Sequence, residues 1–238
     1  LTMSTGMYGD PVRDTLKWWD NANRPAVSNA SFFHSRQIGN FDLVLGGNAF
    51  SDEGYRQLEK EKRHRFNFGT RYRFQKVKGL SAGINGNFMD TYGGYFILWK
   101  SADSAYYPSG GTVSQYHTSR RMIDPYITYY SSKGHRHGLR TRYYEATNRN
   151  NTDQESVSKV WYGEYQCQLR LKKNLTVTSG FTGTYSEVVS GSLYGDHFSS
   201  NASIFSQLDK KFDRLNISLG IRGEYFKVDT AETKTSLI

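Results

Sequence analysis

The sequence predicts an all-β protein folded as an antiparallel transmembrane β-barrel, and three observations predict it. Apolar and polar side chains alternate with a period of two along most of the 238 residues, as they do on the two faces of a strand. Short connections alternate with longer ones, which is typical of membrane barrels with all their tight turns at one end. The longest purely apolar run, residues 95–99, is too short to cross a bilayer as a helix.

The alternation outlines about eleven strands, and the first five cover residues 1–9, 26–37, 41–50, 63–75 and 79–90. In the fourth strand, Phe66, Phe68 and Tyr72 alternate with Arg65 and Arg71, so that one face is apolar and the other polar. The second strand alternates least regularly. A helical interpretation of these segments would scatter the charged side chains around the cylinder.

The last six predicted strands cover residues 117–130, 137–147, 157–171, 175–187, 198–210 and 215–228. The final one alternates strictly, with Leu215, Ile217 and Leu219 on one face and Asn216 and Ser218 on the other. Long strands with one fully apolar face would need a second apolar layer in a soluble protein, and no segment is left to supply it. A soluble all-β binding module or enzyme is therefore the weakest alternative.

The connections between the predicted strands sort by length. Those after the even-numbered strands are tight turns, at residues 38–40, 75–78, 131–135, 172–174 and 211–214. Those after the odd-numbered strands are longer, at residues 10–25, 51–62, 91–116, 148–156 and 188–197. All tight turns would then lie at one end of the sheet and all long loops at the other, whereas a soluble sandwich mixes its loop lengths.

Composition favours the same fold class and excludes others. Aromatic residues make up 15% of the chain, which argues against disorder and suits the aromatic belts at membrane interfaces. The single cysteine, Cys167, excludes a disulfide within the chain and a zinc site built from several cysteines. It alternates onto the apolar face between Tyr165 and Leu169, where a lone cysteine behaves as a small hydrophobe.

An odd number of strands would leave two open edges, and unpaired backbone groups cost several kcal/mol each in lipid. Single-chain bacterial barrels have even strand counts. We therefore expect residues 1–238 to form one partial barrel domain, closed by strands from elsewhere in the same polypeptide or from other chains.

Several sequence blocks resemble a known family. They are YGDP at 8–11, LKWWD at 16–20, FDLVLGGNAF at 41–50, GYRQ at 54–57, LSAGINGN at 80–87, LWKSAD at 98–103, IDPYITYY at 123–130, LYGDH at 193–197 and QLDKKFDRL at 207–215. With these blocks the chain resembles the first half of the barrel of TonB-dependent outer-membrane receptors of the Bacteroidetes type. The resemblance covers nearly the whole chain and says little about the substrate.

The resemblance implies a 22-stranded barrel in the Gram-negative outer membrane, with periplasmic turns and extracellular loops. It implies import of a nutrient ligand, such as a siderophore, corrinoid, glycan or peptide, and no enzymatic activity or cofactor. The implied partners are outer-membrane lipid, the remaining barrel strands, a plug domain and, through that plug, the TonB complex. The plug is not expected within these residues. The alternative is a structural platform for surface lipoproteins.

The polar face supplies the first group of candidate site residues. The residues predicted to face the barrel lumen are Arg65, Arg71, Arg73, Arg140, Arg142, Glu164, Arg170, Arg222 and Glu224. We expect their arginines to pair with Glu164, Glu224, Asp124 or a plug; the alternative is an anionic ligand. Nucleic acid is not expected as a partner, because most aromatic residues fall on the opposite face from the cations.

The long loops supply the second group. The residues predicted to contact a ligand are Trp18, Trp19, Tyr92, Tyr95, Trp99, Tyr106 and Tyr107, because exposed aromatic rings can stack on a sugar or hold an apolar ligand. Packing between neighbouring loops is the alternative role for these side chains. No catalytic constellation stands out, and His135 and His137 fit a solvated turn better than a metal site, which would need further ligands nearby.

Overall fold

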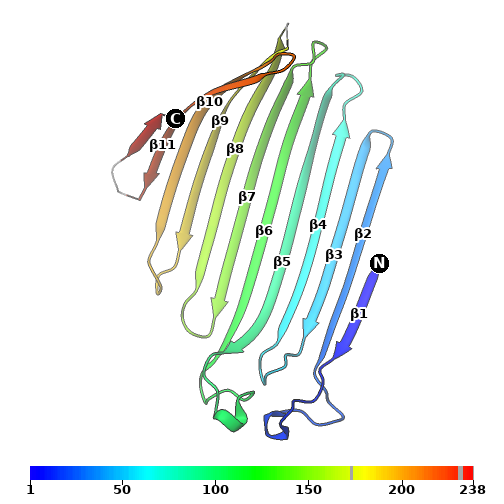
Figure 1. Cartoon of the computed structure of the whole chain (residues 1–238), viewed down its shortest axis with the longest axis vertical. Helices are drawn as coiled ribbons and strands as arrows, with labels where there is room; N and C mark the ends of the chain where they lie inside the picture. The colour runs from blue at the N-terminus through cyan, green and yellow to red at the C-terminus, as the bar shows by residue number, and fades with distance from the viewer. Residues whose placement is uncertain (172–173, 230–232, 238) are drawn as a thin grey trace.

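The computed structural model describes residues 1–171, 174–229 and 233–237. Its strands form one antiparallel sheet in which each strand pairs with its neighbours in sequence, from β1 to β12 (Figure 1). The strands are β1 (Thr2–Met7), β2 (Ala26–Ile38), β3 (Phe41–Asp52), β4 (Glu61–Arg73), β5 (Leu80–Phe96), β6 (Val113–Tyr130), β7 (Arg136–Asn150), β8 (Ser156–Leu171), β9 (Leu175–Val189), β10 (His197–Lys211), β11 (Asn216–Val228) and β12 (Lys234–Leu237). The prediction of an all-β, antiparallel fold is confirmed.

Among the described residues, helical structure is confined to two short 3-10 turns, η1 (Asp14–Leu16) and η2 (Ala102–Ser104), both in loops. Nowhere in the described ranges is there a helix with the length and apolar character needed to span a membrane.

The sheet is a single, twisted layer that stays open. The strand order runs from β1 at one edge to β12 at the other, and no pairing joins these two edges (Figure 1). Closure into a barrel therefore remains a prediction about the larger assembly.

The strand boundaries differ most from the predicted ones around the loop between β5 and β6. β5 extends to Phe96 and β6 begins at Val113, so the loop between them covers residues 97–112 rather than 91–116. The pairing continues here because the Tyr116 ring lies over Gly93, where an added Cβ would approach the ring to 2.4 Å. The short strand β12 was not predicted, and β1 ends at Met7.

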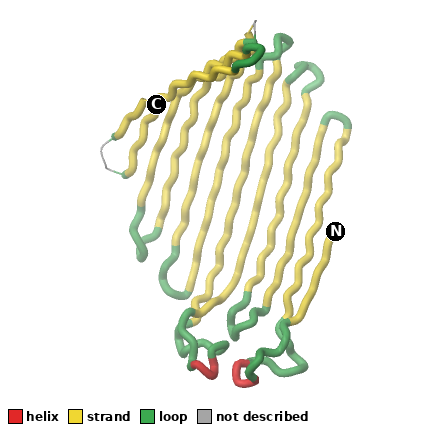
Figure 2. The backbone as a smooth tube through the Cα atoms, in the orientation of Figure 1, coloured by secondary structure: helices red, strands yellow, loops and turns green. Residues whose placement is uncertain are grey.

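The connections lie at the predicted ends of the sheet (Figure 2). The described turns at residues 39–40, 74–79, 131–135 and 212–215 share one end, and the loops at 8–25, 53–60, 97–112, 151–155 and 190–196 share the other. Of the predicted turn 172–174, residues 172–173 lie outside the described residues. The strict alternation of lengths is wrong in one respect, since turn 74–79 is longer than loop 151–155.

The pairing register places the apolar sides of all the long strands on one face. Leu139, Tyr165, Phe181 and Ile204 are partners on four consecutive strands, β7 to β10. We call the side of the sheet that carries these four residues the apolar face. The opposite side, which carries the predicted lumen-facing residues, is the polar face. The alternation along each strand thus adds up to two chemically distinct faces of the sheet.

The apolar face has no covering layer within the described chain. Only Trp19 and Phe96 are buried among the described hydrophobic side chains, and both lie at the loop end. By contrast, Ile204 is 70% exposed and Phe181 is 55% exposed. Large apolar patches left open in this way mark contact with a partner or a membrane.

Local packing within the layer comes from aromatic rings laid over glycines of the neighbouring strand. On the apolar face, Phe32 lies over Gly47 and Phe68 over Gly86, and an added Cβ would come within 2.2 Å and 2.3 Å of these rings. Glycine is needed at both positions because any side chain would displace the ring.

Candidate functional site

The nine residues predicted to face a lumen all lie on the polar face. Strand alternation and register place Arg65, Arg71 and Arg73 of β4, Arg140 and Arg142 of β7, Glu164 and Arg170 of β8, and Arg222 and Glu224 of β11 on this one side. Only the register could show this, because alternation in a single strand does not relate its faces to those of another strand.

Several of these side chains form ion pairs across strands. Arg71 and Arg73 both bind the Asp42 carboxylate, at 2.7 Å and 2.6 Å. Arg142 donates two hydrogen bonds to Asp124, from Nε to Oδ1 at 2.8 Å and from Nη2 to Oδ2 at 2.7 Å. Paired forks of this kind orient the guanidinium as well as neutralising it.

The two glutamates have different partners. Arg222 lies 3.4 Å from Glu224, which also accepts a 2.6 Å hydrogen bond from Asn201. Glu164 instead accepts a 2.5 Å hydrogen bond from the Tyr162 hydroxyl. The expected pairing of arginines with Asp124 and Glu224 is therefore present, whereas Glu164 is engaged by a tyrosine.

A proline interrupts the strand pairing in the middle of the sheet. The pairing of β6 with β7 skips Asp124 and Pro125, because proline has no N–H to donate to the ladder. Two side-chain contacts close the gap: Arg142 binds Asp124, and the Thr141 hydroxyl donates to the Pro125 carbonyl oxygen at 3.3 Å.

The loop end contains an aromatic cluster around Tyr55. The ring of Tyr55 lies 5.4 Å from Tyr8, 5.7 Å from Trp19 and 4.8 Å from Tyr106, measured between centroids. Trp18 packs edge-on against Trp19, and its Nε1 donates a 3.0 Å hydrogen bond to the Tyr55 carbonyl oxygen. The cluster thus joins loops 8–25, 53–60 and 97–112 into one packed unit.

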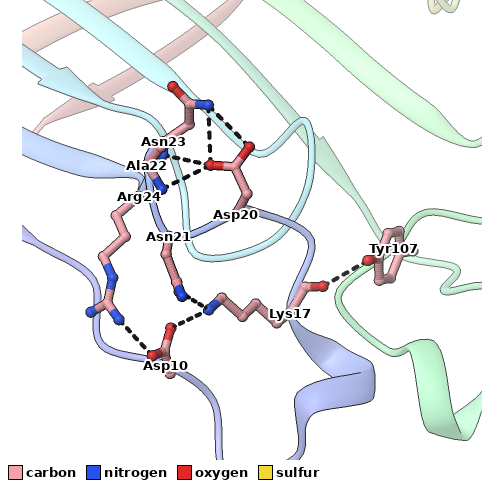
Figure 3. A network of polar contacts seen from close by, with 8 residues as sticks. All are labelled: Asp10, Lys17, Asp20, Asn21, Ala22, Asn23, Arg24 and Tyr107. Atoms are coloured by element: carbon pink, nitrogen blue, oxygen red, sulfur yellow. Dashed lines mark hydrogen bonds and ion pairs between the residues drawn. The ribbon is translucent and has the colours of Figure 1, made fainter.

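Hydrogen bonds fix the first of these loops (Figure 3). The Lys17 ammonium lies 3.0 Å from Asp10, and the Lys17 carbonyl oxygen accepts a 2.8 Å hydrogen bond from the Tyr107 hydroxyl of the third loop. Asp20 accepts hydrogen bonds from the backbone N–H groups of Ala22 and Asn23. The long loops are therefore organised by their own contacts.

Charge and burial shift several titrations in this unit. The hydrogen bond from Lys17, together with nearby Arg24, lowers the pKa of Asp10, and the Asn23 side chain lowers the pKa of Asp20. Burial, reinforced by the hydrogen bond to Asp52, raises the pKa of Tyr8 to about 12.

The predicted ligand-contact residues separate into three groups. Trp18, Trp19, Tyr106 and Tyr107 belong to the packed loop unit, and Trp19 is only 6% exposed. Tyr92 and Tyr95 lie on β5 and not in the loop, because the strand runs to Phe96; they point to opposite faces, and Tyr92 stacks on His117. Trp99 lies in the stem of loop 97–112, where it forms a bridge with Pro108; it is 56% exposed, beside the exposed Ile97 and Leu98.

Sequence reasoning missed Tyr8, Tyr55 and Asp52 as members of the loop unit. Tyr8 and Tyr55 stood in the blocks YGDP and GYRQ, but nothing local indicated that these blocks meet. Their contact follows from the antiparallel pairing of β1, β2 and β3, which brings the ends of residues 8–25 beside residue 52.

The remaining sequence candidates have structural surroundings. His135 lies in the 131–135 turn, where its Nδ1 accepts a hydrogen bond from the Arg170 backbone N–H at 3.1 Å. Cys167 has a free thiol on the apolar face, in register with His137 and Ser179. Across the described ranges, no three His, Cys, Asp or Glu side chains gather in a way that could hold a metal ion.

Comparison with known proteins adds no assignment: no family model matches the chain, and no curated protein is similar to it.

Proposed function

We propose that this chain forms part of the wall of a β-barrel in a Gram-negative outer membrane, and that the parent protein is a TonB-dependent receptor importing a nutrient ligand. The observation that carries the proposal is the apolar face, which nothing in the described chain covers. Lipid tails would cover such a face without a second protein layer.

The length of the apolar stretches supports a membrane span. On the apolar face, uncharged side chains run from Leu80 to Phe88 on β5, from Trp161 to Leu171 on β8 and from Leu175 to Tyr185 on β9. These stretches match the roughly 9–11 residues that a tilted strand needs to cross the hydrocarbon core.

The loop-side border of this band has the chemistry of a membrane interface. Tyr143, Trp161 and Tyr185 are register partners on β7, β8 and β9 and form an aromatic row. Two residues further toward the loops, the same face carries a charged row made of Arg121, Glu145, Lys159 and Glu187. Aromatic residues at the headgroup level followed by charges in water are typical of barrel walls.

The apolar band also crosses the register at an angle. On β5 the band reaches Leu80, which is in register with Tyr129, then His137, then Cys167 on the next three strands. On β8 the band continues beyond Cys167 to Leu171. A band that is level in the membrane crosses the register obliquely when the strands are tilted by about 35–45°.

The polar face would then line the lumen, and the packed loop unit would lie outside the cell. Energy coupling through a plug and the TonB complex is proposed from the sequence resemblance alone, as is the ligand class of siderophore, corrinoid, glycan or peptide.

One observation favours the platform function as a second candidate. Ile97, Leu98 and Trp99, in the stem of loop 97–112, expose 73%, 61% and 56% of their surface. Exposed neighbouring apolar side chains suit docking of another protein, and a surface lipoprotein is the partner proposed for this role. Titrating the purified parent barrel with a co-expressed lipoprotein, with and without Trp99→Ala, separates the two functions.

The membrane assignment is tested by one charge placed on either face of β9. Phe181→Arg puts the charge in the middle of the apolar band, where it costs about 2–4 kcal/mol in lipid. Thr178→Arg puts it on the polar face beside Gln168 and Gln207. Both substitutions are made in the parent barrel; the two variants and the unmodified barrel are folded in detergent and mixed with phosphatidylcholine vesicles, and the inserted fraction is measured by flotation.

We expect Phe181→Arg to reduce insertion at least tenfold and Thr178→Arg to leave it nearly unchanged. Equal insertion of the two variants, or no insertion of the unmodified parent barrel, would overturn the membrane assignment.

A further inference from the structure

A groove runs across the polar face over β5 to β9. Its volume is about 490 Å³, which lies within the roughly 300–1,000 Å³ usual for small-molecule sites. The side chains that give it its chemistry are Asn85, Asp124, Tyr126, Arg140, Tyr162 and Glu164. Their mixture of phenol, amide and charged groups is that of a polar binding site.

The carboxylates of the groove are already engaged. Asp124 is held by both arms of Arg142, and Glu164 accepts the Tyr162 hydroxyl at 2.5 Å. Arg140 lies opposite Glu164 in the register and close enough to Tyr162 to interact electrostatically. Nevertheless, within the described part of the chain its guanidinium makes no hydrogen bond or ion pair, and Arg140 is exposed.

Two more arginines on this face extend the positive charge. Arg136 of β7 and Arg120 of β6 also have no carboxylate partner among the described residues. The Nε atom of Arg136 is buried without a hydrogen-bond partner, which is costly unless another group supplies an acceptor. The strip from Arg136 through Arg140 to Arg120 therefore carries positive charge that the chain does not neutralise.

A guanidinium is a planar fork of donors that matches the two oxygens of an oxyanion. A concave surface with unneutralised positive charge raises the local concentration of anions. Glu164 in the same groove disfavours a ligand with dense negative charge on every side, and Asn85 and Tyr162 suit hydroxyl groups. These features favour a small organic ligand that carries an oxyanion at one end.

We propose that the groove binds a small hydroxylated organic anion through its carboxylate or phosphate on Arg140. The proposal deepens the proposed function by naming a ligand class for the polar face, and in that sense rests on it. The groove itself depends only on the sheet, so the two proposals can fail separately.

The test measures binding of gluconate, a hydroxylated monocarboxylate, to the chain folded in detergent, by isothermal titration calorimetry, with sorbitol as the matched uncharged probe. We expect saturable gluconate binding, no sorbitol binding, and a loss of gluconate affinity of at least tenfold in Arg140→Gln. Lys133→Gln removes the same charge from the 131–135 turn, outside the groove, and should leave the affinity within twofold. Arg140→Lys keeps the charge without the fork and should lie between the two.

Equal gluconate affinities for Arg140→Gln and Lys133→Gln would overturn the proposal, as would the absence of binding to the unmodified chain. Stronger Arg140-dependent binding of a tetraglutamate peptide than of gluconate would overturn it in favour of an acidic protein segment. If Arg140→Gln does not fold, as judged by circular dichroism, Arg140→Lys provides the test. An affinity equal to that of the unmodified chain would then refute recognition of the oxyanion by the guanidinium of Arg140. Insertion of the parent barrel into vesicles reports on the membrane assignment independently.

Discussion

The hydroxyl of Tyr126 on β6 donates a 3.0 Å hydrogen bond to the backbone carbonyl oxygen of Thr70 on β4, two strands away. The side chain reaches that far because it passes over Gly83 of β5, which has no side chain in the way. The pairing of β4 with β5 is interrupted there, between Gly69 and Tyr72. Tyr126 therefore supplies a hydrogen bond that the strand ladder does not make at this point.

Replacing Gly83 by alanine should destabilise the sheet. An added Cβ would lie 2.0 Å from the Thr70 carbonyl oxygen and 2.6 Å from the Tyr126 hydroxyl oxygen. The backbone cannot give way without opening the gap further, so we expect a loss of about 1–3 kcal/mol and a lower Tm. Gly163→Ala on β8 is the matched control, because no atom lies within 4 Å of its added Cβ. Thermal unfolding in detergent measures both, and equal Tm values would contradict the packing described here.

Tyr126→Phe tests the hydrogen bond without changing the ring. It leaves the Thr70 carbonyl oxygen without its side-chain donor, which should cost about 1–2 kcal/mol. Tyr130→Phe on the same strand and face is the control, since Tyr130 is 50% exposed. We expect faster amide exchange at β4 and β5 in Tyr126→Phe alone. Unchanged exchange would show that water replaces the hydroxyl at no cost.

Much of the sheet could be predicted from the sequence because alternation is a local property. Each of Phe66, Leu80 and Trp161 could be assigned to an apolar side from its neighbours, and the antiparallel order followed from the connections. The bond from Tyr126 to Thr70 could not be predicted, because it depends on the register of three strands. Register is set by side-chain packing between strands and by turn geometry, which no single segment contains.

The candidate site divides in the same way. The polar residues of β4, β7, β8 and β11 were identified from the alternation of polar and apolar side chains along each strand. Their partners could not be identified in this way: Glu164 accepts a hydrogen bond from Tyr162, and Asp42 binds two arginines. The loop residues were harder still. For Trp19, ligand contact and packing between loops were both open, and its burial depends on Tyr55 from another loop.

Order in loop 8–25 should depend on acid pH. Lys17 and Arg24 lower the pKa of Asp10 below its ordinary value of 3.8. A carboxyl whose pKa is lower in the folded state stabilises that state above its unfolded pKa and loses this effect as the pH falls through the folded pKa. We therefore expect the loop to stay protected from hydrogen exchange above about pH 4 and to lose protection only below pH 3.8.

Asp10→Asn should reduce the protection of loop 8–25 from hydrogen exchange at neutral pH and make the loss of protection at acid pH smaller. Asp14→Asn, in the exposed 3-10 turn η1, is the control and should leave the protection and its pH dependence unchanged. Asp20, whose pKa is also lowered, should account for the remaining pH dependence. A midpoint above pH 5 would contradict the assignment to these two carboxyls.

Labelling of the native Cys167 tests whether lipid covers the apolar face. It is the one cysteine of the chain and lies on β8 between Tyr165 and Leu169, within the apolar band. Thiols react with maleimides as thiolates, which form in water and not in hydrocarbon. In vesicles we therefore expect a water-soluble maleimide to leave Cys167 unlabelled, while the same reagent labels the detergent-free, urea-unfolded chain completely. In a Cys167→Ser background, Thr178→Cys places the thiol on the polar face of the neighbouring strand β9 and should be labelled in the same vesicles. Rapid labelling of Cys167 in vesicles would mean that water, and not lipid, covers this face, because the two positions differ chiefly in the side of the sheet on which they lie.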